Sequence, residues 1–283
     1  MNGQMQAYTR ASNLPLFERP PVTQVNMGLQ LQALKLRAID LGTLHSRFER
    51  HYPVIEEHPP SPLQIEQFPG NSPSGVHFQF QLLDRPPLPM LAFFSKDRSS
   101  LIQVDSSRFF CAWRRSSVDT TYPRYENFRS EFLRNLEIFD GVTIDINAET
   151  KIITQAEISY INDIPIDQRS RPDILIQRLP GLNSQDPLNE RITGIGITQH
   201  FTYATEQNVD YARLHISAEP VSTESGLVLR LSLVYRGEPR ERFPNVDGLT
   251  AAMRFLDQGH DRIVRAFAEN TTPEAHGAWG RVV

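Results

Sequence analysis

The sequence predicts an α+β fold in which antiparallel β-sheets are covered by long helices. Two observations predict it: segments with alternating apolar and polar residues follow one another closely, and each run of them ends in a long amphipathic segment. The second half repeats the order of the first, so we expect two related antiparallel-sheet units, each a strand, a connection, a β-meander and a long covering helix. A single continuous sheet shared by both halves fits the sequence equally well.

The first unit is predicted at residues 17–150, after a flexible tail at residues 1–16. Pro20 and Pro21 lack N–H donors, so they should precede a strand rather than lie inside it. From Val25 onward apolar and polar residues alternate, which predicts a half-buried strand. A helix is then predicted over residues 38–52. Its buried stripe is expected to contain Leu41, Leu44, Phe48 and Tyr52.

The next segment, residues 53–75, is rich in Pro, Ser and Gly and is predicted to be an irregular loop. A meander follows, with strands predicted at residues 76–83, 89–95, 100–105 and 108–114. The covering helix is predicted over residues 123–140, capped by Thr121 and ended by Asp140-Gly141. Its buried stripe is expected to contain Tyr125, Phe128, Phe132, Leu136 and Phe139.

The second unit is predicted at residues 151–283. Its strands are expected at residues 154–162, 195–203, 212–219 and 227–235, with a short helix near 171–179 inside the proline-punctuated segment 163–193. A long helix over residues 247–269 carries His260 on its apolar stripe, where a histidine is usually hydrogen-bonded in the core or at an interface. A capping box from Thr271 to Glu274 predicts a short final helix.

The composition excludes several classes of protein. Lys and Arg number 29 and Asp and Glu number 33, so the net charge of −4 does not indicate a nucleic-acid binder, although a local basic patch remains compatible with it. The single cysteine excludes an internal disulfide framework and predicts a cytoplasmic protein. No apolar run approaches the ~20 residues of a membrane helix, and the polar start "MNGQMQAYTRASN" predicts no secretory signal.

The first candidate site lies in "SSLIQVDSSRFFCAWRRSS", residues 99–117, which combines arginines and aromatics. A sheet surface of this kind can stack bases and bind phosphates, or recognise a protein partner. Alternatively, the face with Phe109 and Trp113 packs under the helix at 123–140 and the arginines are solvated, which is the commoner arrangement. The predicted binding residues are Arg108, Trp113, Arg114, Arg115 and Arg124.

The second candidate site is a scattered set of ionisable residues. A Glu on a sheet face can act as a general base, and two histidines on neighbouring strands can meet as a proton-transfer pair. Alternatively, these side chains belong to a solvated polar face, which is more frequent. The residues of this alternative catalytic site are Glu157, Asp163, His200 and His215. No H-E-x-x-H, G-x-S-x-G, Walker A or G-x-G-x-x-G motif is present, so no cofactor and no metal are predicted, and Cys111 is expected to be a buried, inert thiol.

Four stretches carry a resemblance to a known family: "FERPPVTQV", which fits F-x-x-P-P-V-x-x-V, "LIQVDSSRFFCAWRR", "YPRYENFRSEF" with "QAEISYIND", and "TTPEAHGAWGR". The chain resembles a sporadically distributed family of bacterial proteins without assigned activity, over nearly its whole length. It departs from the family pattern at Gln24, where Glu is expected, and at Ala112, where Asn is expected. The resemblance implies a bacterial cytoplasmic protein linked to mobile-element or phage-defence loci, and it assigns no residue a catalytic role.

The sequence therefore favours a non-catalytic recognition or complex-forming component, with a protein partner or a second copy of the chain more strongly indicated than a nucleic acid, and with no membrane. Two alternatives stay open. One is a hydrolase or nuclease that uses the scattered Glu, Asp and His residues. The other is a single-stranded nucleic-acid binder that uses the aromatic and arginine face.

Overall fold

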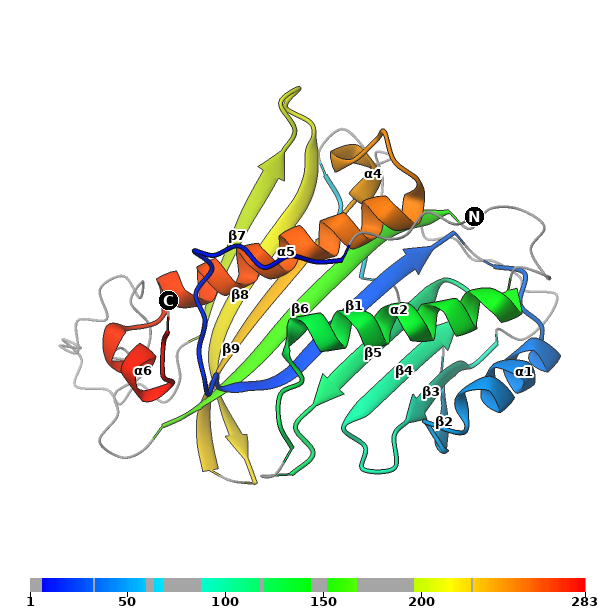
Figure 1. The fold of residues 1–283 in the computed structure, drawn as a ribbon, viewed down its shortest axis with the longest axis horizontal. Coiled ribbons are helices and arrows are strands. Elements are labelled where there is room, and N and C mark those ends of the chain that lie inside the picture. The colour runs from blue at the N-terminus through cyan, green and yellow to red at the C-terminus, as the bar shows by residue number, and fades with distance from the viewer. Residues whose placement is uncertain are drawn as a thin grey trace, which may run out of the picture.

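A computed structural model describes residues 7–32, 34–59, 64–68, 88–117, 120–143, 152–166, 196–224 and 226–282. These residues form an α+β structure with one nine-stranded antiparallel sheet, whose strands follow the order β2-β3-β4-β5-β1-β6-β9-β8-β7 (Figure 1). The strands are β1 Val22–Leu31, β2 Val54–His58, β3 Met90–Phe94, β4 Ser100–Asp105, β5 Arg108–Arg114, β6 Ile153–Pro165, β7 Ile197–Ala204, β8 Asp210–Thr223 and β9 Gly226–Gly237. The helices are α1 Ala38–Phe48, α2 Arg124–Thr143, α4 Pro239–Arg242, α5 Gly248–Asn270 and α6 Pro273–Ala278.

The centre of the sheet is the antiparallel pair of β1 and β6. Met27 lies opposite Ile158 on β6 and opposite Cys111 on β5, so β1 joins strands from both halves of the chain. The apolar face predicted from Val25 is confirmed, because Val25, Met27, Leu29 and Leu31 are all buried. The strand is not half-buried as predicted, because Asn26 and Gln30 on its other face are buried as well. Of the two arrangements that the sequence left open, the described residues form the continuous sheet.

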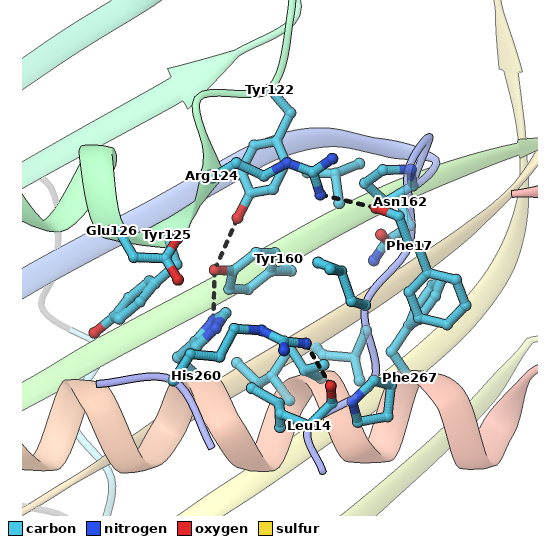
Figure 2. A pocket seen from close by; sticks show the side chains of 18 residues that line it. Leu14, Phe17, Tyr122, Arg124, Tyr125, Glu126, Tyr160, Asn162, His260 and Phe267 are labelled. Atoms are coloured by element: carbon cyan, nitrogen blue, oxygen red, sulfur yellow. Dashed lines mark hydrogen bonds between the residues drawn. The ribbon is translucent and has the colours of Figure 1, made fainter. Parts of the chain in front are cut away.

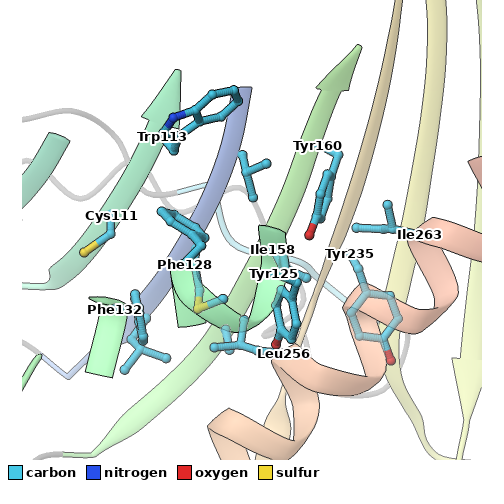
Figure 3. Close-up of a cluster of buried hydrophobic side chains, with 14 of the residues drawn as sticks. Cys111, Trp113, Tyr125, Phe128, Phe132, Ile158, Tyr160, Tyr235, Leu256 and Ile263 are labelled. Carbon is cyan, nitrogen blue, oxygen red and sulfur yellow. The ribbon is translucent and has the colours of Figure 1, made fainter. Parts of the chain in front are cut away.

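Three helices cover one face of this sheet. The Phe109 ring of β5 packs on Phe132 of α2 at 5.4 Å between ring centroids, and Tyr235 of β9 packs on Phe255 of α5 at 4.8 Å. Figure 3 shows Phe132 of α2 and Leu256 of α5 in the same buried cluster as Trp113 of β5. Near the β2 edge of the sheet, the Phe48 ring of α1 lies 5.3 Å from the ring of Phe93 in β3. The apolar residues predicted for the helices at 38–52 and 123–140 are buried as expected, but α1 ends at Phe48, so Tyr52 lies beyond the helix. One core therefore runs between the helices and this face.

The N-terminal segment, residues 7–20, crosses α5 before it enters β1 (Figure 1). Tyr8 donates a hydrogen bond to Asp261 of α5 at 2.6 Å, and Leu14 is fully buried. The backbone of Leu16 accepts a hydrogen bond from Val282, near the other end of the chain. Residues 7–16, which the sequence assigned to a flexible tail, thus pack against the folded structure.

Several element boundaries differ from the prediction. The loop predicted at 53–75 contains β2, an edge strand that pairs only with β3. The helix α2 does not stop at Gly141 but continues to Thr143. The final helix α6 is capped by Thr272 rather than Thr271, whose hydroxyl instead bonds to His276. The short helix α4 was not predicted.

The strand predicted at 76–83 and the helix predicted near 171–179 lie outside the described residues. The other predicted strands are present: β3, β4 and β5 form the first meander, and β7, β8 and β9 form the second. A search of the described residues for a helix both long enough and apolar enough to cross a membrane found none.

Candidate functional site

The face of the sheet opposite the helices is lined with polar side chains, and we call it the polar face. Strand alternation creates it, because the residues between the buried apolar positions of each strand point to this side. Its polar residues on the five adjacent strands β5, β1, β6, β9 and β8 are Arg108, Arg114, Gln24, Asn26, Gln30, Gln155, Glu157, Ser159, Asp163, Arg213, His215, Ser217, Glu219, Arg230, Ser232 and Arg236.

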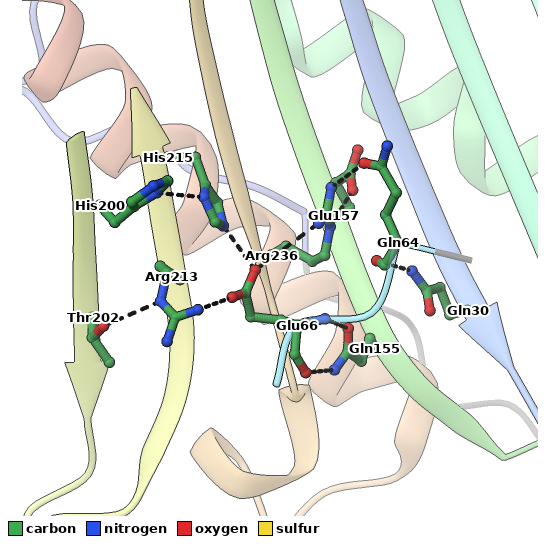
Figure 4. Close-up of polar contacts among 10 residues, drawn as sticks. All are labelled: Gln30, Gln64, Glu66, Gln155, Glu157, His200, Thr202, Arg213, His215 and Arg236. Carbon is green, nitrogen blue, oxygen red and sulfur yellow. Dashed lines mark hydrogen bonds and ion pairs between the residues drawn. The ribbon is translucent and has the colours of Figure 1, made fainter. Parts of the chain in front are cut away.

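A short segment of the chain, residues 64–68, binds across part of the polar face (Figure 4). The side-chain amide of Gln155 holds its backbone at Glu66 from both sides: Glu66 N donates to Gln155 Oε1 at 2.8 Å, and Gln155 Nε2 donates to the Glu66 carbonyl at 2.7 Å. Gln30 Nε2 donates to the carbonyl of Gln64 at 2.8 Å. Side-chain amides on the face of the sheet therefore bind the backbone of this segment.

The carboxylate of Glu66 is the centre of the cluster. It pairs with Arg213, accepts from His215 Nε2 at 2.7 Å and lies 3.9 Å from Arg236, and only 6% of the residue is exposed. Burial raises the pKa of Glu66, but the hydrogen bond from His215 and the charges of His215, Arg213 and Arg236 outweigh it, so the pKa lies below its ordinary value. An ionised carboxylate is thus bound in a pocket of basic side chains.

Other arginines of the polar face are neutralised within the sheet itself. Arg236 Nε lies 2.5 Å from Glu157, and Arg230 Nε lies 2.8 Å from Asp163. Both are cross-strand pairs between β6 and β9. The polar face is consequently a surface of paired charges rather than a continuous basic patch.

His200 and His215 meet across β7 and β8, as one of the predictions allowed. Their Nδ1 atoms are 2.7 Å apart, and His215 Nε2 contacts Glu66, so a carboxylate and two imidazoles form a continuous hydrogen-bonded chain. Such a chain can pass a proton between its members. Glu157 is connected to it through Arg236, which contacts both Glu157 and Glu66.

Asp163 lies apart from this group. It is six residues along β6 from Glu157, and its carboxylate is bound by Arg230. The four residues of the predicted catalytic set are therefore not brought together as one site. Among the described residues, no cluster of three or more His, Cys, Asp or Glu side chains is arranged to hold a metal ion.

The five predicted binding residues lie on different sides of the molecule. Arg108 and Arg114 are on the polar face, and Arg115 is exposed just after β5 ends. Trp113 is 4% exposed on the helix-covered face, where its ring packs 5.5 Å from Tyr122, as the alternative arrangement expected. Arg124 begins α2 and donates to the carbonyls of Phe17 and Glu18.

Sequence reasoning missed Glu66, the residue at the centre of the cluster. Its segment "QIEQF" lies in a stretch that composition assigns to a loop, and its ligands Gln155, Arg213 and His215 follow about 90 to 150 residues later in the chain. The sequence of the segment gives no local signal, because Ile65, Glu66, Gln67 and Phe68 do not alternate between apolar and polar residues.

No family model matches the chain, and no curated protein matches its sequence.

Proposed function

We propose that the protein is a non-catalytic recognition component that binds a protein partner on the polar face of its sheet. The partner supplies an extended segment with an acidic side chain, and this segment binds where residues 64–68 lie. The observation that carries the proposal is the way the sheet holds Glu66, with its backbone clamped by Gln155 and its carboxylate enclosed by Arg213, His215 and Arg236.

The contacts of this segment are those used to bind extended peptides. Backbone hydrogen bonds give affinity that does not depend on sequence, and a pocket for one side chain gives specificity. The ring of Phe68, which is 1% exposed, lies under the Arg213 guanidinium at 5.4 Å and adds an apolar anchor two residues from Glu66. A partner with an acidic residue followed by an aromatic would reproduce these contacts.

The balance of charge favours a protein partner over a nucleic acid. Arg236 and Arg230 pair with Glu157 and Asp163, so they do not form the uncompensated basic track that a phosphate backbone needs. An acidic peptide requires only the local pocket around Glu66.

We also propose that the sheet is built from two related units, and the order of the strands supports this. In the first half, β3, β4 and β5 return to pair with β1, and α2 follows; in the second, β7, β8 and β9 return to pair with β6, and α5 follows. The setting that we propose, a bacterial cytoplasm and a link to mobile-element or defence loci, rests on the sequence resemblance and on the single cysteine.

The experiment adds the segment around Glu66 to the protein as a separate peptide. A fluorescein-labelled peptide of residues 61–72 is titrated into the Glu66→Ala variant, in which the internal segment loses its carboxylate anchor. We expect micromolar binding by fluorescence anisotropy, and about tenfold weaker binding of the peptide with Gln in place of Glu66, because a charge-assisted bond is lost. The matched control is Glu56→Ala, which removes a carboxylate of β2 that pairs with Arg98. This variant should bind the peptide no better than the unaltered protein does.

Two results would contradict the proposal. The first is equal binding of the Glu and Gln peptides, or no binding of either up to millimolar concentration. The second is that a single-stranded oligothymidylate binds Glu66→Ala more tightly than the peptide does, with an affinity that falls steeply as salt rises, which would indicate a nucleic-acid site.

A further inference from the structure

A cavity of about 370 Å³ lies on the other side of the sheet, among the N-terminal segment, the start of α2, β6 and α5 (Figure 2). Its volume is within the range of small-molecule sites. We propose that this cavity binds an amphipathic small molecule with an apolar body and a carboxylate head group. The site is separate from the polar face, because Tyr160 and Asn162 point from β6 toward the helices.

The apolar part of the cavity comes from segments far apart in the sequence. Its apolar lining is Leu14, Pro15, Leu16, Phe17, Pro20, Val22, Leu233, Ile263, Val264 and Phe267. The N-terminal segment supplies the first five of these residues, and α5 supplies the last three. Such a lining offers an alkyl chain or a ring contact on several sides, and burial of that surface would drive binding.

Arg124 provides the charge for a head group. Its guanidinium donates to the carbonyls of Phe17 at 2.8 Å and Glu18 at 2.9 Å, which fixes it against the N-terminal segment. Two carbonyls use only part of its five N–H donors, and among the described residues it pairs with no carboxylate. A guanidinium at the edge of an apolar cavity that is not bound to a carboxylate favours an anionic ligand.

The backbone of Arg124 gives a second, independent indication. Its φ is 67°, in the left-handed region that non-glycine residues rarely adopt. Strained residues of this kind cluster at ligand sites, where the surrounding structure holds a side chain in a required position. The strain here places the guanidinium at the junction of α2, the N-terminal segment and the cavity.

A chain of buried polar groups adds hydrogen-bonding capacity beside Arg124. The hydroxyls of Tyr122 and Tyr160 are 3.2 Å apart, and the Tyr160 hydroxyl lies 2.8 Å from His260 Nδ1. If His260 carries its proton on Nδ1, it donates to Tyr160, Tyr160 donates to Tyr122, and the Tyr122 proton is left for a ligand. A carboxylate would select this arrangement because it only accepts.

The carboxylate of Glu126 lines the same cavity and affects the affinity of the cavity for an anionic ligand. It is exposed, and it is the single carboxylate among the described lining residues. It should weaken the binding of an anion modestly, because exposed charges interact through water. Its replacement by Gln is therefore expected to strengthen binding.

The experiment is calorimetric titration of the whole chain with dodecanoate below its micelle concentration, and with dodecan-1-ol as the uncharged match. We expect dodecanoate to bind in the micromolar range and the alcohol about tenfold more weakly. Arg124→Met and Tyr122→Phe should each weaken dodecanoate about tenfold and leave the alcohol unchanged. Glu126→Gln should bind dodecanoate more tightly. Arg19→Met is the matched control, since Arg19 is exposed and does not line the cavity.

A cavity-filling variant keeps the test decisive if Arg124→Met does not fold. Val264→Trp introduces a larger side chain from α5 into the cavity and should abolish binding of both probes without altering any charge. The proposal is overturned if dodecanoate does not bind, if dodecanol binds as tightly as dodecanoate, or if Val264→Trp binds both probes as the unaltered protein does.

Discussion

Among single residues, His260 is the clearest case of chemistry set by burial. It lies on the inner face of α5, bonds to the Tyr160 hydroxyl and stacks on the Tyr125 ring with the ring centroids 3.9 Å apart. Burial, together with the charge of Arg10, lowers the pKa of His260 to about 3. The imidazole is therefore neutral at neutral pH.

This burial predicts a pH-dependent stability. The folded pKa of about 3 lies below the ordinary value of 6.5, so the unfolded chain binds the proton first as pH falls. The contribution of neutral His260 to the free energy of unfolding is complete above pH 6.5. It is lost as pH decreases toward 3, at up to about 1.4 kcal/mol per pH unit. In His260→Asn, whose side-chain amide keeps a hydrogen-bonding group near the position of Nδ1 but does not titrate, this pH-dependent loss of stability should be absent.

The measurement is urea unfolding of both proteins between pH 4.5 and 8. The difference between their unfolding free energies removes the contribution of the carboxylates, which both proteins share. The expected difference shrinks steadily below pH 6, whereas parallel curves over the whole range would show that His260 is protonated equally in the folded and unfolded chains.

At the residue scale, the sequence predicts what local alternation controls. The position of His260 on an apolar stripe correctly indicated a hydrogen-bonded core histidine, and the alternation through Phe109, Cys111 and Trp113 placed these side chains on one face. Glu66 was not predictable, because its burial depends on Arg213 and His215, almost 150 residues away.

At the scale of elements, the contact of α5 with the sheet depends on a glycine. A Cβ added to Gly259 would lie 2.5 Å from Tyr235 Cδ1 and 2.7 Å from Ile158 Cγ2, closer than carbon atoms can approach. The helix thus rests directly on β6 and β9 at this position.

A pair of glycine variants tests this packing. Gly259→Ala should lower the free energy of unfolding by about 1–3 kcal/mol, because the helix must move away from the sheet. Gly141→Ala in α2, where an added Cβ meets nothing within 4 Å, should raise it by roughly 0.5–1 kcal/mol through helix propensity. Chemical denaturation of the two variants gives both values, and a change of the same sign in both would contradict the close contact.

Elements were predictable in proportion to their length and amphipathicity. The 23-residue α5 and the long strands carry many repeats of their period, so tertiary context did not change them. The edge strand β2 has only five residues between prolines and pairs on one side, which left composition to indicate a loop. Gly141 does not end α2, since a glycine within a helix is tolerated when no left-handed turn follows.

Across the whole molecule, contacts between the two halves hold the fold together. Arg129 of α2 binds Asp257 of α5 through Nε at 2.7 Å, and Tyr125 donates to the same carboxylate at 2.6 Å. On the opposite face, Asn26 of β1 donates to Ser159 of β6 at 2.8 Å. The helix layer and the sheet are therefore both continuous across the predicted boundary at residue 150.

This junction is the part of the fold that sequence patterns could not decide. Periodicity predicts β1 and β6 separately, but the pairing of Asn26 with Ser159 spans 133 residues and leaves no local signal. The order of elements was sufficient to suggest two units and insufficient to tell whether they share a sheet.

Separate expression of residues 1–150 and 151–283 tests whether the halves are independent. Each fragment would expose a long central strand as an edge: β1 in the first, which has ten residues, and β6 in the second, which has thirteen. Long apolar edges pair with other chains, so we expect each fragment alone to aggregate or form mixed oligomers in size-exclusion chromatography with light scattering. Co-expression should restore a soluble one-to-one complex, because β1 and β6 then pair with each other. A monomeric fragment with a cooperative unfolding transition would instead show that a single half forms a complete domain, and the β1–β6 pair would then be an interface between two domains rather than the centre of one.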